Sequence, residues 1–191
     1  MGRYHFTRRL WLTALAATLV FTGVAVSVSQ NKHHTGPIKN FGKINENYYR
    51  GSQPVKEDYA ELKAMGIKTV IDLRRDFQVD EPERVRGAGM QYFNIPLKSS
   101  KPATPEQTDY FLKLVDDPNN WPVYVHCKGG RHRTGALTAI YRIKHDGWTA
   151  DRAYQEMTEF DFNHGFFGGP SEQKKFVYEF YQRRLAAAGQ H

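Results

Sequence analysis

One string of ten residues combines a nucleophile, cations and glycines at spacings that suit chemistry on phosphate esters. It runs from position 126 to 135 as HCKGGRHRTG and holds Cys127, the only cysteine of the 191-residue chain. A thiol has an ordinary pKa of about 8.5, so it is a good nucleophile at neutral pH only where its thiolate is stabilised. A glycine-containing loop that leads into a helix offers converging backbone N–H groups, which stabilise a thiolate and bind phosphate. We therefore expect Cys127 to attack phosphorus from within a phosphate-binding loop.

The chemistry of phosphate binding also explains the residue types at the other positions of the loop. Arg133 presents a planar fork of N–H donors that matches two oxygens of a phosphate group. Glycines at 129 and 130 let the backbone fold tightly, and a threonine hydroxyl at 134 can hydrogen-bond the thiolate. The predicted substrate-binding residues are Lys128, Gly129, Gly130, Arg131, His132, Arg133 and Thr134. The competing interpretation, a buried structural cysteine before a turn, leaves the cations at 128, 131 and 133 unexplained.

The string matches the His-Cys-x5-Arg-Thr-Gly signature, and the chain resembles the cysteine-based protein tyrosine and dual-specificity phosphatases. Two upstream segments, YRGSQP at 49–54 and GIKTVIDLR at 66–74, are similar to the atypical dual-specificity phosphatases of plant, fungal and bacterial type. The resemblance covers about residues 40–182. It implies a central, mainly parallel sheet with helices on both sides.

The resemblance also implies a two-step reaction. Cys127 takes the phosphoryl group to form a phosphocysteine, Arg133 clamps that group, and His126 and Thr134 support the thiolate; water then hydrolyses the intermediate. Backbone amides and Arg133 supply the charge stabilisation, so neither a metal nor another cofactor is expected.

The sequence does not identify the general acid. Many members of the family carry an aspartate after the strand that corresponds to residues 91–95, whereas the loop here, PLKSSKP at 96–102, has no carboxylate. The proton must then come from water or from another side chain. The candidates are Asp76, Asp80, Asp161, His164 and His132.

Hydrophobic patterns around the loop predict an α/β fold. Short apolar, β-branched runs at 67–73, 91–95 and 123–126 indicate strands. Amphipathic stretches indicate helices at 56–65, 81–88, 104–115, 134–145, 150–160 and 171–185, and Thr104 to Gln107 forms a capping box. This alternation implies a mainly parallel sheet of about four to five strands flanked by helices, with ligands bound beyond the carboxyl ends of the strands. A hydrophobic helix at the N-terminus precedes the sheet.

The N-terminal segment has the properties of a membrane anchor. Residues 10–28 carry no charged side chain and follow a basic stretch that includes Arg8 and Arg9. A helix of this length spans about 28 Å, close to the apolar thickness of a membrane. The flanking charge favours a cytoplasmic N-terminus and export of the remainder. We expect residues 1–28 to anchor a catalytic domain outside the cytoplasm; the alternatives are a cleaved signal peptide, which gives a secreted or periplasmic protein, and a buried core helix.

The composition of the chain sets its domain bounds and limits the kinds of partner, disulfide and metal site that it could have. Residues 29–40 are predicted to be a linker and residues 41–187 a phosphatase domain, which we expect to be monomeric. The net charge of +7 suits anionic substrates, but no basic run with interleaved aromatic residues indicates nucleic acid. A single cysteine excludes an intramolecular disulfide and a zinc site built from a cysteine cluster. The adjacent His33 and His34 do not by themselves indicate a metal.

We expect a phosphomonoester hydrolase that acts first on phosphotyrosine or on phosphoserine and phosphothreonine of proteins. Lys128 and Arg131, with His132 beside them, favour an alternative substrate with further negative charge, an inositol phosphate or a phosphoinositide. A sulfurtransferase and a non-catalytic phosphate-binding module are weaker alternatives. The former usually has a shorter loop, and the latter typically lacks the cysteine or the arginine.

Overall fold

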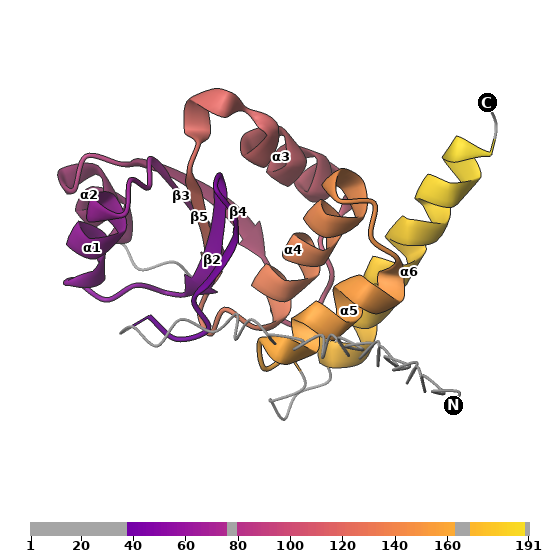
Figure 1. Ribbon diagram of the computed structural model, residues 1–191. Helices are drawn as coiled ribbons and strands as arrows, with labels where there is room; N and C mark the ends of the chain where they lie inside the picture. The colour runs from indigo at the N-terminus through magenta and orange to yellow at the C-terminus, as the bar shows by residue number, and fades with distance from the viewer. Residues whose placement is uncertain (1–37, 76–79, 163–168, 190–191) are drawn as a thin grey trace, which may run out of the picture. The chain divides into compact units, whose positions relative to one another are not determined.

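A five-stranded sheet forms the centre of the part of the chain that the computed structural model describes, residues 38–75, 80–162 and 169–189 (Figure 1). The strands are β1 (Gly42–Asn45), β2 (Tyr48–Ser52), β3 (Thr69–Arg74), β4 (Gln91–Leu97) and β5 (Val123–Cys127). Their order is β1-β2-β5-β3-β4, with parallel pairing except between β1 and β2, which are antiparallel. The predicted mainly parallel α/β sheet is therefore confirmed.

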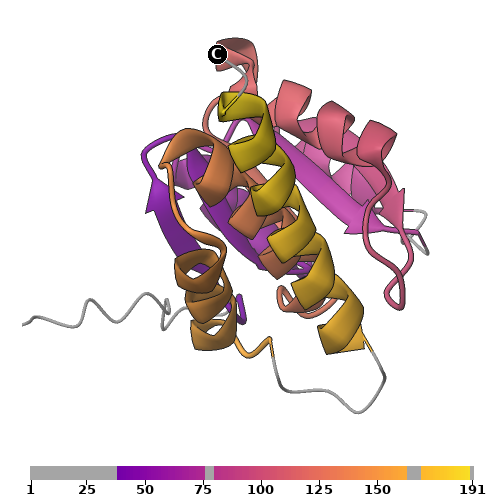
Figure 2. The ribbon, with the colours of Figure 1, turned by 90° about the vertical axis from the view of Figure 1, so that its right-hand side faces the viewer.

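Helices cover both faces of the sheet (Figures 1 and 2). They are α1 (Asp58–Ala64), α2 (Glu81–Gly87), α3 (Pro105–Asp116), α4 (His132–His145), α5 (Ala150–Glu159) and α6 (Gly169–Ala188), with a 3-10 turn at Pro118–Asn120. Because side chains alternate along a strand, β3 and β5 feed two cores. Val70 and Tyr124 pack with α1 and α2, whereas Ile71 and Val125 pack with the other four helices.

Local signals in the sequence account for several of these elements. Thr104 caps α3, since its side chain accepts from Gln107 N and the Gln107 side chain accepts from Thr104 N, as the capping box predicts. Gly66 follows α1 with φ at 88°, a left-handed conformation that glycine adopts without strain. Strands β1 and β2 were not among the predicted strands. Residues 42–52 lack a run of branched apolar side chains, and only tertiary pairing makes them strands.

The register of β5 determines what lies near the predicted loop. Cys127 pairs with Ser52 of β2, and His126 pairs with both Gly51 of β2 and Asp72 of β3. The chain then turns through residues 128–131 into α4, the helix with the most extensive buried surface here, with eleven buried residues. The loop is thus fixed between the central strand and a core helix.

The predicted N-terminal hydrophobic helix at 10–28 lies outside the described residues. Within the described ranges, no helix has the length and apolar character needed to cross a bilayer. The described part starts at Ile38, whose side chain is buried beside Phe41 and Tyr124 in the core next to α1 and α2.

Candidate active site

A pocket of about 370 Å³ opens at the carboxyl end of β5. Six residues of the predicted loop line it: Cys127, Lys128, Gly129, Arg131, His132 and Arg133. Two further residues, Lys39 and Ser99, come from segments distant in the sequence. Gly130 and Thr134 belong to the same loop and helix start but do not line the pocket. The structure thus brings six of the predicted residues together in one pocket and adds Lys39 and Ser99, which the sequence analysis did not name.

The Cys127 side chain is almost completely buried, with 3% of its surface exposed. Burial opposes ionisation of the thiol, but several groups outweigh it and lower the pKa of Cys127. These groups are the Arg133 guanidinium, the Thr134 hydroxyl and the backbone N–H groups of Thr134 and Gly129. Among the described residues Thr134 Oγ1 makes no bond to another nitrogen or oxygen, so it is available to the sulfur. A thiolate at neutral pH is a strong nucleophile.

The carboxyl ends of two neighbouring strands hold the Arg133 guanidinium in place. Its Nη1 donates to Leu97 O of β4 at 3.2 Å and lies 3.5 Å from Leu73 O of β3. The side chain is only 7% exposed and still lines the pocket. A guanidinium oriented in this way can present its remaining N–H groups to two oxygens of one phosphoryl group.

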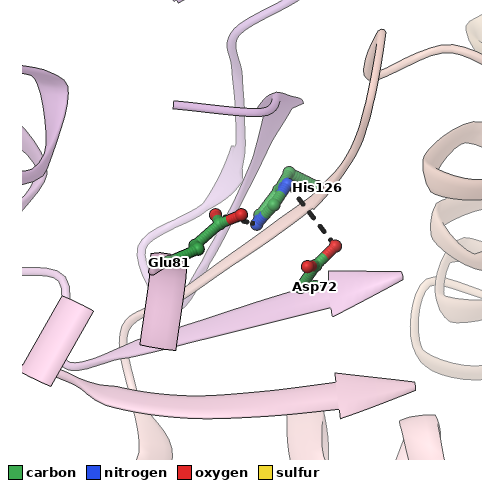
Figure 3. Close-up of side chains that lie close together, drawn as sticks. All are labelled: Asp72, Glu81 and His126. Atoms are coloured by element: carbon green, nitrogen blue, oxygen red, sulfur yellow. Dashed lines mark ion pairs between the residues drawn. The ribbon is translucent and has the colours of Figure 1, made fainter. Parts of the chain in front are cut away.

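Behind Cys127, His126 lies in a fully buried cluster of charged side chains (Figure 3). Its Nε2 is 3.1 Å from Glu81 Oε1 and its Nδ1 is 3.9 Å from Asp72 Oδ1. The same Nδ1 is 3.4 Å from the carbonyl oxygen of Cys127. His126 therefore joins the backbone of the nucleophile to two carboxylates, Asp72 and Glu81, that sequence reasoning missed.

Arg74 supplies the cation of this cluster. Its Nε and Nη2 donate to the two carboxylate oxygens of Asp72 at 2.8 and 2.7 Å, and its Nη2 also contacts Glu81 Oε2. Burial opposes ionisation of Asp72, but the Arg74 hydrogen bonds and the His126 charge outweigh it and lower the pKa of that carboxyl. The sequence does contain a signal for this charged cluster. The string IDLR at 71–74 places two charged residues in a buried strand, and buried charges need partners.

The same residues have the spacing of a metal site. Ligand atoms of Asp72, Glu81 and His126 lie within 4.8 Å of one another. Arg74, however, already binds both carboxylates, so a guanidinium occupies the position that a metal ion would take. We assign this cluster to the support of β5 and not to metal binding.

The described candidates for the general acid are poorly suited to it. Burial, with Arg131 and Arg133 nearby, lowers the pKa of His132, although the Phe162 backbone opposes the shift; His132 is therefore neutral at pH 7. Asp80 pairs with Arg84 at 2.5 Å, and Asp161 is an exposed residue with φ at 60°. Among the residues that the structure describes, no carboxylate lines the pocket. Asp76 and His164 lie outside the described residues.

Comparison with known proteins agrees with this geometry. The family model described as "DSP-PTPase phosphatase fused to NAD+ Kinase" matches residues 24–178. The dual specificity protein phosphatase TpbA of Pseudomonas aeruginosa is 28% identical over 138 residues, which cover 72% of this chain and 60% of TpbA. The inositol diphosphatase DSP3 of Arabidopsis thaliana is 29% identical over 139 residues, 68% of each chain.

Solved structures share the fold. The crystal structure of TpbA has a TM-score of 0.67 and 25% identity, and the match covers 82% of this chain and 95% of TpbA as crystallised. The core catalytic domain of the PP-IP phosphatase Siw14 from S. cerevisiae has a TM-score of 0.66 over 82% of this chain and 96% of that domain, with 21% identity. The family match extends over most of the chain, and the chain belongs to the DSP-PTPase family of cysteine-based phosphatases.

Proposed function

We propose that Cys127 is the nucleophile of this phosphatase. The observation that carries the proposal is a buried thiol with a lowered pKa at the bottom of a pocket that Arg133 also lines. The thiolate attacks phosphorus, an S–P bond forms, and the P–O bond to the leaving group breaks. Water then attacks phosphorus, breaks the S–P bond and returns the thiolate, and inorganic phosphate is released. The Arg133 guanidinium and the backbone N–H groups stabilise the charge on the phosphoryl oxygens.

The groups around the pocket favour substrates with a good leaving group. Among the described residues no carboxylate lines the pocket, and the lowered pKa of His132 makes it a less available acid for a departing alkoxide at pH 7. The phenolate of tyrosine, whose conjugate acid has a pKa of about 10, needs less assistance than an aliphatic alkoxide. Phosphotyrosine in proteins is therefore the first substrate class. TpbA is named as a dual specificity protein phosphatase, and one of its structures holds pTyr.

A second substrate class is favoured by the charge of the pocket. Lys39, Lys128 and Arg131 line it in addition to Arg133, and one phosphoryl group does not require so many cations. A polyphosphorylated inositol supplies further negative charge, and a diphosphate adds a leaving group that is already a weak base. Relatives of this chain are named inositol diphosphatases.

The deciding experiment compares kcat/KM for a phosphotyrosine peptide, an aryl phosphate, an inositol hexakisphosphate and a diphosphoinositol phosphate, in the wild type and in Lys128→Ala/Arg131→Ala. If proteins are the substrates, the peptide has the highest kcat/KM and the double variant affects all substrates alike. If polyanions are the substrates, the double variant lowers kcat/KM selectively for them, by roughly fivefold to tenfold for each lost contact. Turnover of none of these esters contradicts the phosphatase assignment.

The location of the enzyme is a separate part of the proposal. The uncharged segment 10–28 behind Arg8 and Arg9 supports a membrane anchor with the catalytic domain outside the cytoplasm. A C-terminal reporter that is active only after export should be active, and membranes should retain the protein after a high-salt wash. Activity of a reporter that works only in the cytoplasm would overturn the orientation, and release of a shortened chain would indicate a cleaved signal peptide.

A further inference from the structure

Three consecutive carbonyl groups of the phosphate-binding loop each accept a hydrogen bond from one earlier segment of the chain. We call this segment, residues 39–53, the brace. The donor and acceptor atoms are Gln53 N and Lys128 O at 3.3 Å, Asn40 Nδ2 and Gly129 O at 2.8 Å, and Arg50 Nη2 and Gly130 O. The brace is itself closed by a bond from Ser52 N to Lys39 O at 2.8 Å.

These bonds determine where the N–H groups of the loop point. A trans peptide group is planar, and its C=O and N–H bonds point in opposite directions. A carbonyl held by the brace therefore turns the N–H of the following residue away from the brace. The N–H groups concerned are those of Gly129, Gly130 and Arg131. The Gly129 N–H interacts with the Cys127 sulfur and helps to lower the thiol pKa, in agreement with this orientation.

The brace and the loop also pack without space between them. Gly130 has φ at 66°, and a Cβ at this position would lie 2.5 Å from the carbonyl carbon of Gly51 and 2.7 Å from Ser52 N. Real Cβ atoms do not approach backbone so closely. The loop backbone therefore lies directly on the end of β2, and only glycine fits at position 130.

Arg50 is the unusual member of the brace because its charged side chain is completely buried. Its guanidinium lies 4.0 Å from the centre of the Phe160 ring. Its Nε and Nη1 are buried and make no hydrogen bond among the described residues, so its bond to Gly130 O is the one that orients it. A buried cation with so few partners is costly. Attraction to Tyr48, to the Glu156 carboxylate and to the Cys127 thiolate offsets part of this cost.

We propose that Asn40 and Arg50 are positioning residues of the phosphatase reaction. They hold the carbonyl groups of Gly129 and Gly130 away from the substrate, so that the following N–H groups face the phosphoryl group, and Arg50 places a buried positive charge behind the thiolate. The inference rests on the proposed role of Cys127 as the nucleophile.

The first test uses Asn40→Gly, which removes the amide donor and keeps the left-handed backbone that Asn40 adopts, with φ at 52°. The matched control is Asn45→Ala, which also lies within residues 39–53 but deletes a 2.7 Å amide hydrogen bond to Tyr141 Oη and not to the phosphate-binding loop. We expect Asn40→Gly to weaken inhibition by vanadate and to lower kcat/KM for an aryl phosphate by about fivefold each, the effect of one hydrogen bond. Asn45→Ala should keep both within about twofold.

The second test measures the ionisation of the Cys127 thiol directly. The rate of Cys127 alkylation by iodoacetamide as a function of pH reports the thiolate fraction of the free enzyme. Arg50→Gln removes the buried charge and should shift the titration to higher pH, whereas Arg50→Lys keeps a charge and should shift it less. Thermal unfolding of each variant is measured in parallel, since loss of stability alone does not move a thiol pKa.

The outcomes separate positioning from support of the fold. If Asn40→Gly and Arg50→Lys lower only the melting temperature, and leave vanadate inhibition and the thiol titration as in the wild type, the brace merely stabilises the domain and the inference is wrong. These two variants decide the matter even if Arg50→Gln does not fold. A failure of the nucleophile assignment looks different, because Cys127→Ser would then keep its turnover of an aryl phosphate.

Discussion

Behind the carboxyl end of β5, Asp72, Arg74 and Glu81 surround His126, whereas in front of it Cys127 faces Arg133 and the open pocket. Both regions are rich in charge, but the rear cluster is buried, whereas Lys39 and Lys128 of the front pocket are exposed. In the rear cluster each carboxylate contacts the Arg74 guanidinium, so both have a cationic partner inside the protein. In the front pocket, the lining that the structure describes contains cations and no carboxylate. The difference indicates that the rear cluster supports the strand, while the front leaves its positive potential for an anionic substrate.

The largest expected effect comes from removing the thiol. Cys127→Ser should reduce turnover of an aryl phosphate to below about 1% of the wild type, because a serine hydroxyl does not ionise in this pocket. Binding of inorganic phosphate, measured by calorimetry, should remain, since Arg133 and the backbone amides are unchanged. Substantial residual turnover would remove Cys127 from the reaction, and loss of phosphate binding would show that the thiol itself builds the anion site.

A change in the rear cluster should act on stability. Arg74→Met leaves Asp72 and Glu81 buried without their cation, and we expect a loss of about 3–5 kcal/mol in the free energy of unfolding. The matched control is Arg84→Met, which removes an exposed arginine paired with Asp80 and should cost less than about 1 kcal/mol. Urea unfolding of both variants measures the difference. Equal losses would show that the rear cluster is no more important than a surface ion pair.

The pH dependence of Cys127 alkylation tests the front pocket separately from the rear cluster. The pKa of Cys127 is lowered, so the thiolate persists below the ordinary thiol pKa and is lost as the pH falls through the lowered value. Alkylation of the free enzyme should therefore persist to lower pH than that of an ordinary thiol, and it should decline about tenfold per pH unit below the thiol pKa. Removing the guanidinium in Arg133→Gln should move this decline to higher pH. An unchanged curve would assign the shift to the Thr134 hydroxyl and the backbone N–H groups.

The smallest expected effect comes from removing Lys39 from the pocket lining. Lys39 lines the pocket at the edge of the brace and makes no contribution to the thiol pKa among its main causes. Lys39→Ala should lower kcat/KM for a polyphosphorylated inositol by about fivefold and leave an aryl phosphate nearly unchanged. The control is Lys43→Ala, which removes an exposed lysine paired with Glu46 in β1. If both substrates lose equally, Lys39 serves the common phosphoryl group.

Local patterns predicted the parts of the fold that local chemistry determines. The loop at 126–135, the strands β3, β4 and β5 and the capped helix α3 each have a signal within a few consecutive residues, and these elements are present where expected. Sequence reasoning did not assign Lys39, Asn40 and Arg50 to the site, because they reach it only through the pairing of β2 with β5. Glu81 was placed in a helix, but its contact with His126 depends on how α2 packs against the sheet.

The burial of Cys127 has a consequence for oxidation. A thiolate reacts with peroxide to give a sulfenic acid, which in many proteins is rescued by a second cysteine that forms a disulfide. This chain contains no second cysteine, so within it the oxidised sulfur can condense only with a backbone nitrogen. Otherwise, further peroxide drives it to the sulfinic acid, from which thiols do not recover it. The restricted access to the 3% exposed side chain is thus the protection that the chain itself provides against permanent inactivation.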